Sequence, residues 1–231
     1  MRKPTLLLTR PAESAERFAA ALDPVAIAGM RVLIAPLMRI DPVATEPPAV
    51  EAAIFTSAQG PRHAPPGAGR PAYCVGAQTT AAARAHGWQA ICAGQTAAAL
   101  VDTLRTDPPA GRLTHLAGAH QRGDIAERLR DAGLHAMRHT IYRQVLLPLS
   151  DAARDALEGP AIVPLFSPRT ARQFCEQLAL PAPQARLILL SAAVDMGLDR
   201  VNPEEIRIAK APTGVEMRKT VEIECRRITS A

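Results

Sequence analysis

The chain has 231 residues, of which 48% are hydrophobic and 21% are charged. This length and composition predict a globular protein built as one large domain or as two domains of about 100 residues each. No apolar run approaches the roughly 18 residues of a membrane-spanning helix, and the run Leu6–Leu8 is too short for a secretory signal. We therefore expect a cytoplasmic protein with no membrane partner.

The net charge of +5 would suit a nucleic acid, a membrane surface or an acidic small molecule. Aromatic residues make up only 3% of the chain, too few to stack the bases of a single-stranded nucleic acid, so we expect no nucleic-acid partner. Lysine occurs only at Lys3, Lys210 and Lys219, and the other basic residues are arginines, which suit bidentate carboxylate recognition. A general compositional bias would explain the arginines equally well. The four cysteines form no C-x-x-C pair and stand near no histidine cluster, so the sequence indicates neither a metal site nor a disulfide framework.

The first predicted elements are a buried strand at Leu6–Leu8 and a helix with apolar residues spaced from Ala15 to Leu22. A strand at 31–34 leads into an extended, proline-punctuated segment at 36–43, which we interpret as a linker. Strands at 52–55, 72–75, 89–92 and 113–117 then alternate with helices at 78–86, 96–106 and 122–132. The prolines and glycines between Gln59 and Ala72 leave little room for a regular helix there.

A second extended segment, 142–148, would return the chain from the middle of the sequence, so that two parallel crossings reach an inserted domain. The alternation then resumes with a helix at 150–158, a strand at 161–166, a helix at 168–179, strands at 186–190 and 206–209, and a terminal helix from Thr213 towards Arg226. This pattern is typical of parallel sheets covered on both faces. We expect two parallel-sheet α/β domains joined by a two-stranded linker: a discontinuous outer domain of 1–37 and 146–231, and an inserted domain of 42–141.

The two halves share a repeated pattern. Ser57 and Ser167 each follow a buried strand, and each is followed by another buried strand and then by a short strand that leads through alanine to Thr96 or Thr213. A duplicated α/β unit whose strand ends face each other makes a cleft, where a ligand would bind.

Hydroxyl residues stand where predicted strands end and helices begin, at Thr9, Ser57, Thr79, Ser167 and Thr213. Such hydroxyls cap helices, and capping alone would justify each of them. As a set, several helix starts on one side of a sheet also form an anion-binding surface, to which Arg10 and Arg122 would add full charges. No nucleophilic triad, nucleotide-binding loop or paired carboxylates is visible. Tyr142 stands where the chain leaves the inserted domain, and on general grounds it is as well explained by packing as by function.

In this order, these motifs resemble the uroporphyrinogen-III synthase family. The resemblance is carried by Leu8-Thr9-Arg10-Pro11, Phe55-Thr56-Ser57, Val75-Gly76 with Thr79, Gly118 with Arg122, Tyr142, Phe166-Ser167-Pro168 and Pro212-Thr213. It implies a cofactor-free and metal-free cyclising hydro-lyase of tetrapyrrole biosynthesis that closes hydroxymethylbilane with inversion of ring D and loss of water. It further implies a monomer, which takes its substrate from hydroxymethylbilane synthase. Tyr142 would be catalytic, and the substrate would bind at Arg10, Ser57, Ala58, Gly76, Thr79, Arg122, Ser167 and Thr213.

Two segments depart from the family pattern. The proline-rich stretch after Ser57 replaces a helix, and Ser191-Ala192-Ala193-Val194 replaces a glycine and threonine turn in the second half. The alternative is therefore a weak or inactive homologue that binds an acidic ligand as a two-domain regulatory protein.

Overall fold

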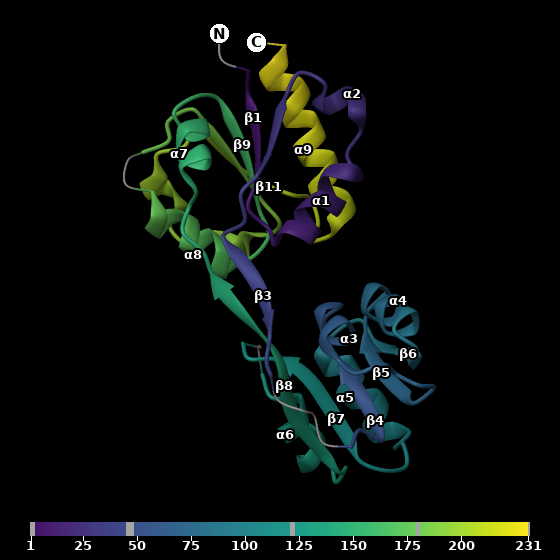
Figure 1. Ribbon diagram of the computed structural model, residues 1–231. Helices are drawn as coiled ribbons and strands as arrows, with labels where there is room; N and C mark the ends of the chain where they lie inside the picture. Colours follow the sequence, from purple (N-terminus) through teal and green to yellow (C-terminus); the bar gives the residue numbers. More distant parts are fainter. Residues whose placement is uncertain (1–2, 45–48, 121–122, 179–180, 231) are drawn as a thin grey trace. The chain divides into compact units, whose positions relative to one another are not determined.

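In a computed structural model the chain forms two compact units, one of Met1–Arg39 with Val145–Ala231 and one of Ile40–Gln144. The structure describes residues 3–44, 49–120, 123–178 and 181–230. Each unit contains a mainly parallel β-sheet with helices on both faces (Figure 1). The predicted fold class, two α/β domains with a two-stranded connection, is confirmed. No helix in the described ranges is long and apolar enough to cross a membrane.

The first unit, which we call the outer unit, has a five-stranded parallel sheet. Its strand order is β11 (Glu205–Ile208), β10 (Ala185–Leu189), β9 (Ala161–Leu165), β1 (Thr5–Leu8) and β2 (Arg31–Ile34). One face carries α1 (Ala12–Ala20), α2 (Pro24–Ile27) and α9 (Gly214–Thr229). The other carries α7 (Asp151–Leu157), α8 (Pro168–Gln177) and the short 3₁₀ helices η1 (Ala192–Val194) and η2 (Leu198–Val201).

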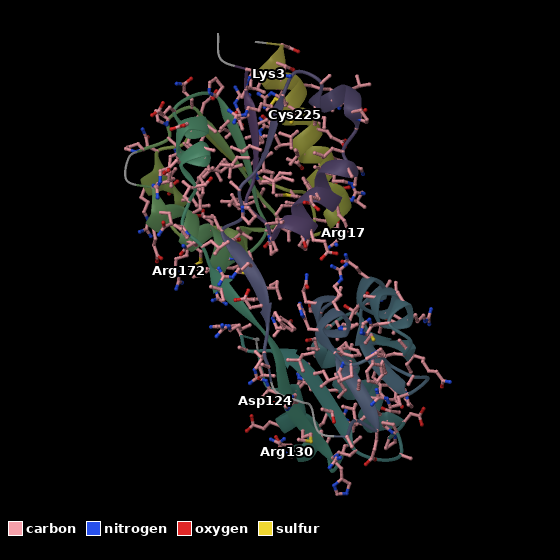
Figure 2. All side chains as sticks on the ribbon, in the orientation of Figure 1. Lys3, Arg17, Asp124, Arg130, Arg172 and Cys225 are labelled. Carbon is pink, nitrogen blue, oxygen red and sulfur yellow. The ribbon has the colours of Figure 1, made fainter. Side chains whose placement is uncertain are left out.

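The alternation of strand side chains explains why both faces are covered. Leu6 and Leu8 of β1 pack into the cluster under α1 and α9, whereas Leu7 packs into the cluster under α7 and α8. Successive strand residues point to opposite faces, so a continuous apolar strand needs a helical layer on each side. Figure 2 shows the side chains filling these layers, with the buried Cys225 on α9.

The second unit, which we call the inner unit, has a six-stranded sheet. Its strand order is β3 (Met38–Pro42), β8 (Ala136–Leu146), β7 (Leu113–Gly118), β4 (Ala52–Phe55), β5 (Pro71–Val75) and β6 (Gln89–Gly94). One face carries α3 (Gln59–His63) and α4 (Ala77–Ala85), and the other carries α5 (Ala97–Thr106) and α6 (Ile125–Asp131).

The chain passes between the units twice, along β3 and β8, which are neighbours in the sheet. The backbone N–H of Val43 donates to Ile141 O at 3.0 Å, and the N–H of Leu147 donates to Leu37 O at 2.9 Å. Val43 pairs with Ile141 and Leu37 with Leu147, so the two crossings run antiparallel. The expectation of parallel crossings is wrong. Both are ladder-bonded strands, so the linker is part of a sheet.

The repeated pattern corresponds to a repeated topology. β4, β5 and β6 succeed one another outwards in the inner unit, as β9, β10 and β11 do in the outer unit. Thr96 and Thr213 cap the helices that follow β6 and β11, accepting hydrogen bonds from Ala99 N and Glu216 N at 3.2 Å. After β10, however, the three-residue η1 stands where α4 follows β5 in the inner unit, within the altered Ser191–Val194 segment.

Several element boundaries differ from expectation. A five-residue helix, α3, forms in the proline-rich stretch because Pro61 lies in its first turn, where a missing N–H costs no helical hydrogen bond. Helix α6 begins at Ile125 instead of 122, behind the cap Asp124. β8 begins at Ala136, well before the predicted second linker. Helix α8 ends at Gln177. The predicted end of this helix, at 179, lies outside the described residues.

Candidate functional site

Each sheet has a point where the strand order reverses. In the outer unit the chain winds from β1 to β2 on one side and returns to β9 on the other; in the inner unit it winds from β4 to β5 and β6, then returns to β7. Ligands of such sheets bind at the carboxyl ends of the strands beside the reversal. The residues that follow β1 and β9, and those that follow β4 and β7, therefore define one candidate edge in each unit.

At the inner edge, a β-bulge places Tyr142. The pairing of β7 and β8 shifts from Ala117 opposite Thr140 to Gly118 opposite Tyr142, so Ile141 is an extra residue on β8. As a result Ile141 and Tyr142, although consecutive, both pack into the cluster around Phe55. Bulges re-aim side chains in this way.

Gly118 lets the Tyr142 ring cross the end of β7. A Cβ built on Gly118 would lie 2.5 Å from Tyr142 Cε2, so no other residue fits there without displacing the ring. The phenol thereby reaches the end of the next strand, β4, where it hydrogen-bonds with the Ser57 side chain, and it also hydrogen-bonds with the Gly118 backbone. The His63 ring of α3 lies 5.4 Å from the Tyr142 ring.

Burial raises the pKa of Tyr142 above its ordinary value, because the charged phenolate is poorly solvated there. The hydrogen bonds with Ser57 and Gly118 act in the opposite direction, as donors to the phenolic oxygen do. The group is therefore neutral at pH 7. A neutral phenol can donate a hydrogen bond as well as accept one.

The other predicted residues of the inner unit lie at neighbouring strand ends. Ser57 Oγ accepts a hydrogen bond from Gln59 N at 3.2 Å, and Ala58 is the residue from which α3 starts. Gly76, with φ of 76°, starts α4 after β5. Thr79 was expected to cap that helix, but it lies buried inside α4, whose first turn has no side-chain cap. The positive φ of Gly76 starts the helix too early for Thr79 to cap it.

At the outer edge, Arg10 and Phe166 face each other across the reversal between β1 and β9. The Arg10 guanidinium carbon lies 4.2 Å from the centroid of the Phe166 ring, and Phe18 packs edge-on against the same ring at 5.1 Å. Burial lowers the pKa of Arg10, and the nearby charge of Arg17 lowers it further. A cation stacked on a ring and short of water is a good partner for a carboxylate.

Two further predicted residues of the outer unit are helix caps. Ser167 Oγ accepts from Thr170 N at 3.2 Å and lies 2.8 Å from Thr170 Oγ1 at the start of α8. Thr213 caps α9 after β11, two strands away from β9. Thr9 caps nothing, because α1 begins behind Pro11 without a side-chain cap. Arg122 lies outside the described residues.

The predicted residues therefore fall into two groups, one per unit. Arg10, Ser167 and Thr213 belong to the outer unit; Ser57, Ala58, Gly76, Thr79 and Tyr142 belong to the inner unit. No sequence pattern selects His63 or Arg138. Phe166, by contrast, could have been selected as the aromatic residue between a strand and its capping serine. Among the described residues, no cluster of three or more His, Cys, Asp or Glu side chains could hold a metal ion.

Comparison with known proteins relates the chain to a family. A family model described as uroporphyrinogen-III synthase HemD matches residues 17–194. The uroporphyrinogen-III synthetase of Helicobacter pylori is 15% identical over 97% of this chain and 100% of its own, with a TM-score of 0.64, which shows a common fold. A mutant uroporphyrinogen III synthase of Thermus thermophilus is 12% identical over 96% of this chain and 99% of its own, with a TM-score of 0.48. No curated protein matches the sequence.

Proposed function

The chain belongs to the uroporphyrinogen-III synthase family, and from that membership we propose that it cyclises hydroxymethylbilane to uroporphyrinogen III. The reaction inverts ring D and releases water, which makes the protein a cyclising hydro-lyase of tetrapyrrole biosynthesis. In this proposal it acts as a cytoplasmic monomer, without a metal or cofactor, on substrate released by hydroxymethylbilane synthase.

The observation that carries the proposal is the buried phenol of Tyr142 at the inner edge. Loss of the substrate hydroxyl as water requires a proton or a strong hydrogen bond to the departing oxygen. Tyr142 is neutral at pH 7, so its phenolic O–H is able to donate a hydrogen bond to that oxygen. The electron pair of the breaking C–O bond leaves with the hydroxyl, which departs as water. The pyrrole N–H of the same ring loses a proton, which restores the phenol, and the neutral azafulvene so formed closes through a spiro intermediate.

The substrate class fits the rest of both edges. Hydroxymethylbilane carries eight carboxylates, and the edges present an arginine, helix starts and hydroxyls, all of which bind carboxylates. Arg10, Ser167 and Thr213 serve this role in the outer unit. Ser57, Ala58, Gly76 and Thr79 serve it in the inner unit, to which the family pattern adds Arg122. Holding the flexible chain in one orientation is itself worth several kcal/mol of activation free energy.

The test is the isomer formed from enzymatically generated hydroxymethylbilane. The type III isomer is expected, at a rate proportional to protein concentration and unaffected by a chelator. Formation of the type I isomer alone, at the rate of the protein-free control, would contradict the proposal. Tight binding of the substrate with only type I product would instead identify a binding protein.

A further inference from the structure

The shape of the inner edge depends on a side chain outside the family motifs, Arg138 of β8. Its Nη2 donates to Gly118 O at 2.8 Å and to Ala119 O at 3.0 Å. These carbonyls lie at the end of β7, where the bulge at Ile141 has moved the ladder out of register. One guanidinium group therefore binds both of them at the point where the regular pairing ends.

The same two residues determine where the Tyr142 phenol lies. Gly118 lies directly under the ring, and the Ala119 N–H donates to the backbone oxygen of Tyr142 at 2.8 Å. A shift of either residue would move the ring relative to Ser57 on the neighbouring strand. Arg138 itself is four residues away from Tyr142, and it binds the backbone carbonyls of Gly118 and Ala119, so it acts through that backbone.

We propose that Arg138 is a positioning residue, which holds the end of β7 in the bulged register that aims the Tyr142 hydroxyl. This inference rests on the proposed function for its kinetic consequence, but not for its structural one. A misplacement of about 1 Å at a reacting group can cost about 100-fold in rate, so the loss should appear in kcat.

The chain offers a matched control that binds a carbonyl of β8. Arg130 of α6, labelled in Figure 2, donates from Nη1 to the oxygen of Ala136, the first residue of β8, at 3.1 Å. Arg130→Met and Arg138→Met each remove a guanidinium group from a carbonyl of this region and keep an apolar stem. Only the carbonyls bound by Arg138 belong to the residues that contact Tyr142.

The experiment measures kcat, KM and the position of the Tyr142 titration in full-length protein. The chain has two tyrosines, so in a Tyr73→Phe background the tyrosinate absorbance reports Tyr142 alone. For Arg138→Met we expect kcat to fall about 10-fold to 100-fold with KM changed less than about 2-fold. The Tyr142 pKa should move towards its ordinary value as water reaches the ring, since burial is the main cause of its elevation. Arg130→Met should leave both readouts near those of the parent.

Parent-like kcat and an unmoved Tyr142 titration in Arg138→Met would overturn the proposal, as would equal changes in the two variants. Where Arg138→Met does not fold, Arg138→Gln replaces it, because the shorter neutral amide cannot reach both carbonyls; parent-like values there overturn the proposal too. If the parent protein makes no type III isomer, the proposed function fails, and the titration still decides the role of Arg138.

Discussion

Three neighbours allow the Tyr142 ring to lie buried away from water, where the phenol is neutral. Gly118 supplies the space, Ile141 supplies the extra residue that turns the ring, and Ser57 supplies a hydrogen-bonding partner after the next strand. The hydroxyl is thus the one part of the side chain whose removal changes hydrogen bonding but not packing.

Tyr142→Phe should therefore lower kcat by at least about tenfold, since positioned acid catalysis is typically worth about 10²–10⁴ in rate. Ser57 and Gly118 lose a partner, so the free energy of unfolding should fall by about 1 kcal/mol. Steady-state kinetics and urea unfolding measure the two effects. Tyr73→Phe is the control for loss of a phenol elsewhere. Unchanged turnover in Tyr142→Phe would make the ring a packing residue only.

His115 makes stability depend on pH. It is buried in β7, with Nε2 at 3.3 Å from Thr56 Oγ1, and burial followed by the charge of Arg138 lowers its pKa to about 4, against a small opposing effect of Asp124. Below about pH 6.5 His115 is protonated in the unfolded chain, whereas in the folded chain it stays neutral until about pH 4. Acid over that range therefore favours unfolding.

We expect up to about 3 kcal/mol of stability to be lost between pH 6.5 and pH 4 through this one group. Urea unfolding at several pH values would show the slope, and His115→Gln should flatten it. The same substitution at the exposed His135 is the control. An equally steep loss in His115→Gln would assign the acid sensitivity to other groups.

Single residues were also where sequence reasoning failed. Ser167 and Thr213 were predicted at helix starts and are caps there, because the chain order of strand, hydroxyl and helix is local information. Thr79 was misplaced because the φ of Gly76 decides where α4 begins, and composition does not reveal φ. No sequence motif marks Arg138 as part of the site, since its partners are backbone carbonyls at the end of another strand.

At the scale of elements, α9 is attached to its sheet by a buried carboxylate. Glu224 of α9 is fully buried, and its Oε1 lies 3.0 Å from both Arg207 Nε of β11 and Arg227 Nη1, with Arg186 of β10 at 3.7 Å from Oε2. Removing one member of a buried pair is costly, because the remaining charges lose their partner.

Glu224→Gln should accordingly lower the free energy of unfolding by about 2–3 kcal/mol, somewhat below the usual range because Glu204 and Glu205 still pair with the arginines. Glu216→Gln on the same helix breaks a surface pair with Lys219 and should cost less than about 1 kcal/mol. Urea unfolding of both variants gives the comparison. Equal costs would show that burial adds nothing to the Glu224 interaction.

Elements were predictable where periodicity is strong and less so at their ends. The alternation of strands and helices predicted the two sheets, because strands buried on both faces are recognisable as continuous apolar runs. The bulge at Ile141 and the early start of β8 were not predictable, because register is set by pairing with β7 and not by the residues of β8 alone.

At the scale of the molecule, the inner unit is a continuous segment whose two ends lie on paired strands. Its two apolar clusters, one on each face of the sheet, contain described residues of that unit only. A segment with its own core and adjacent ends meets the requirements of an autonomous domain.

Residues 40–144 expressed alone should therefore fold, with a cooperative urea transition and the circular dichroism of an α/β protein. Residues 145–231 alone should not, because the outer sheet would lack β1 and β2, and β1 lies between β9 and β2. Failure of 40–144 to unfold cooperatively would mean that the inner unit depends on the outer one for stability.

The position of β1 has a consequence for synthesis. β1 is synthesised before the whole inner unit, whereas its neighbour β9 begins at Ala161, after that unit. At a synthesis rate of about 5–20 residues per second, β9 follows β1 out of the ribosome after roughly 8–30 s. During that interval the inner unit can fold and β1 can pair with β2, but the other edge of β1 stays open, and an open strand edge attracts wrong partners. The nascent protein is thus exposed to aggregation through this edge until β9 has been synthesised.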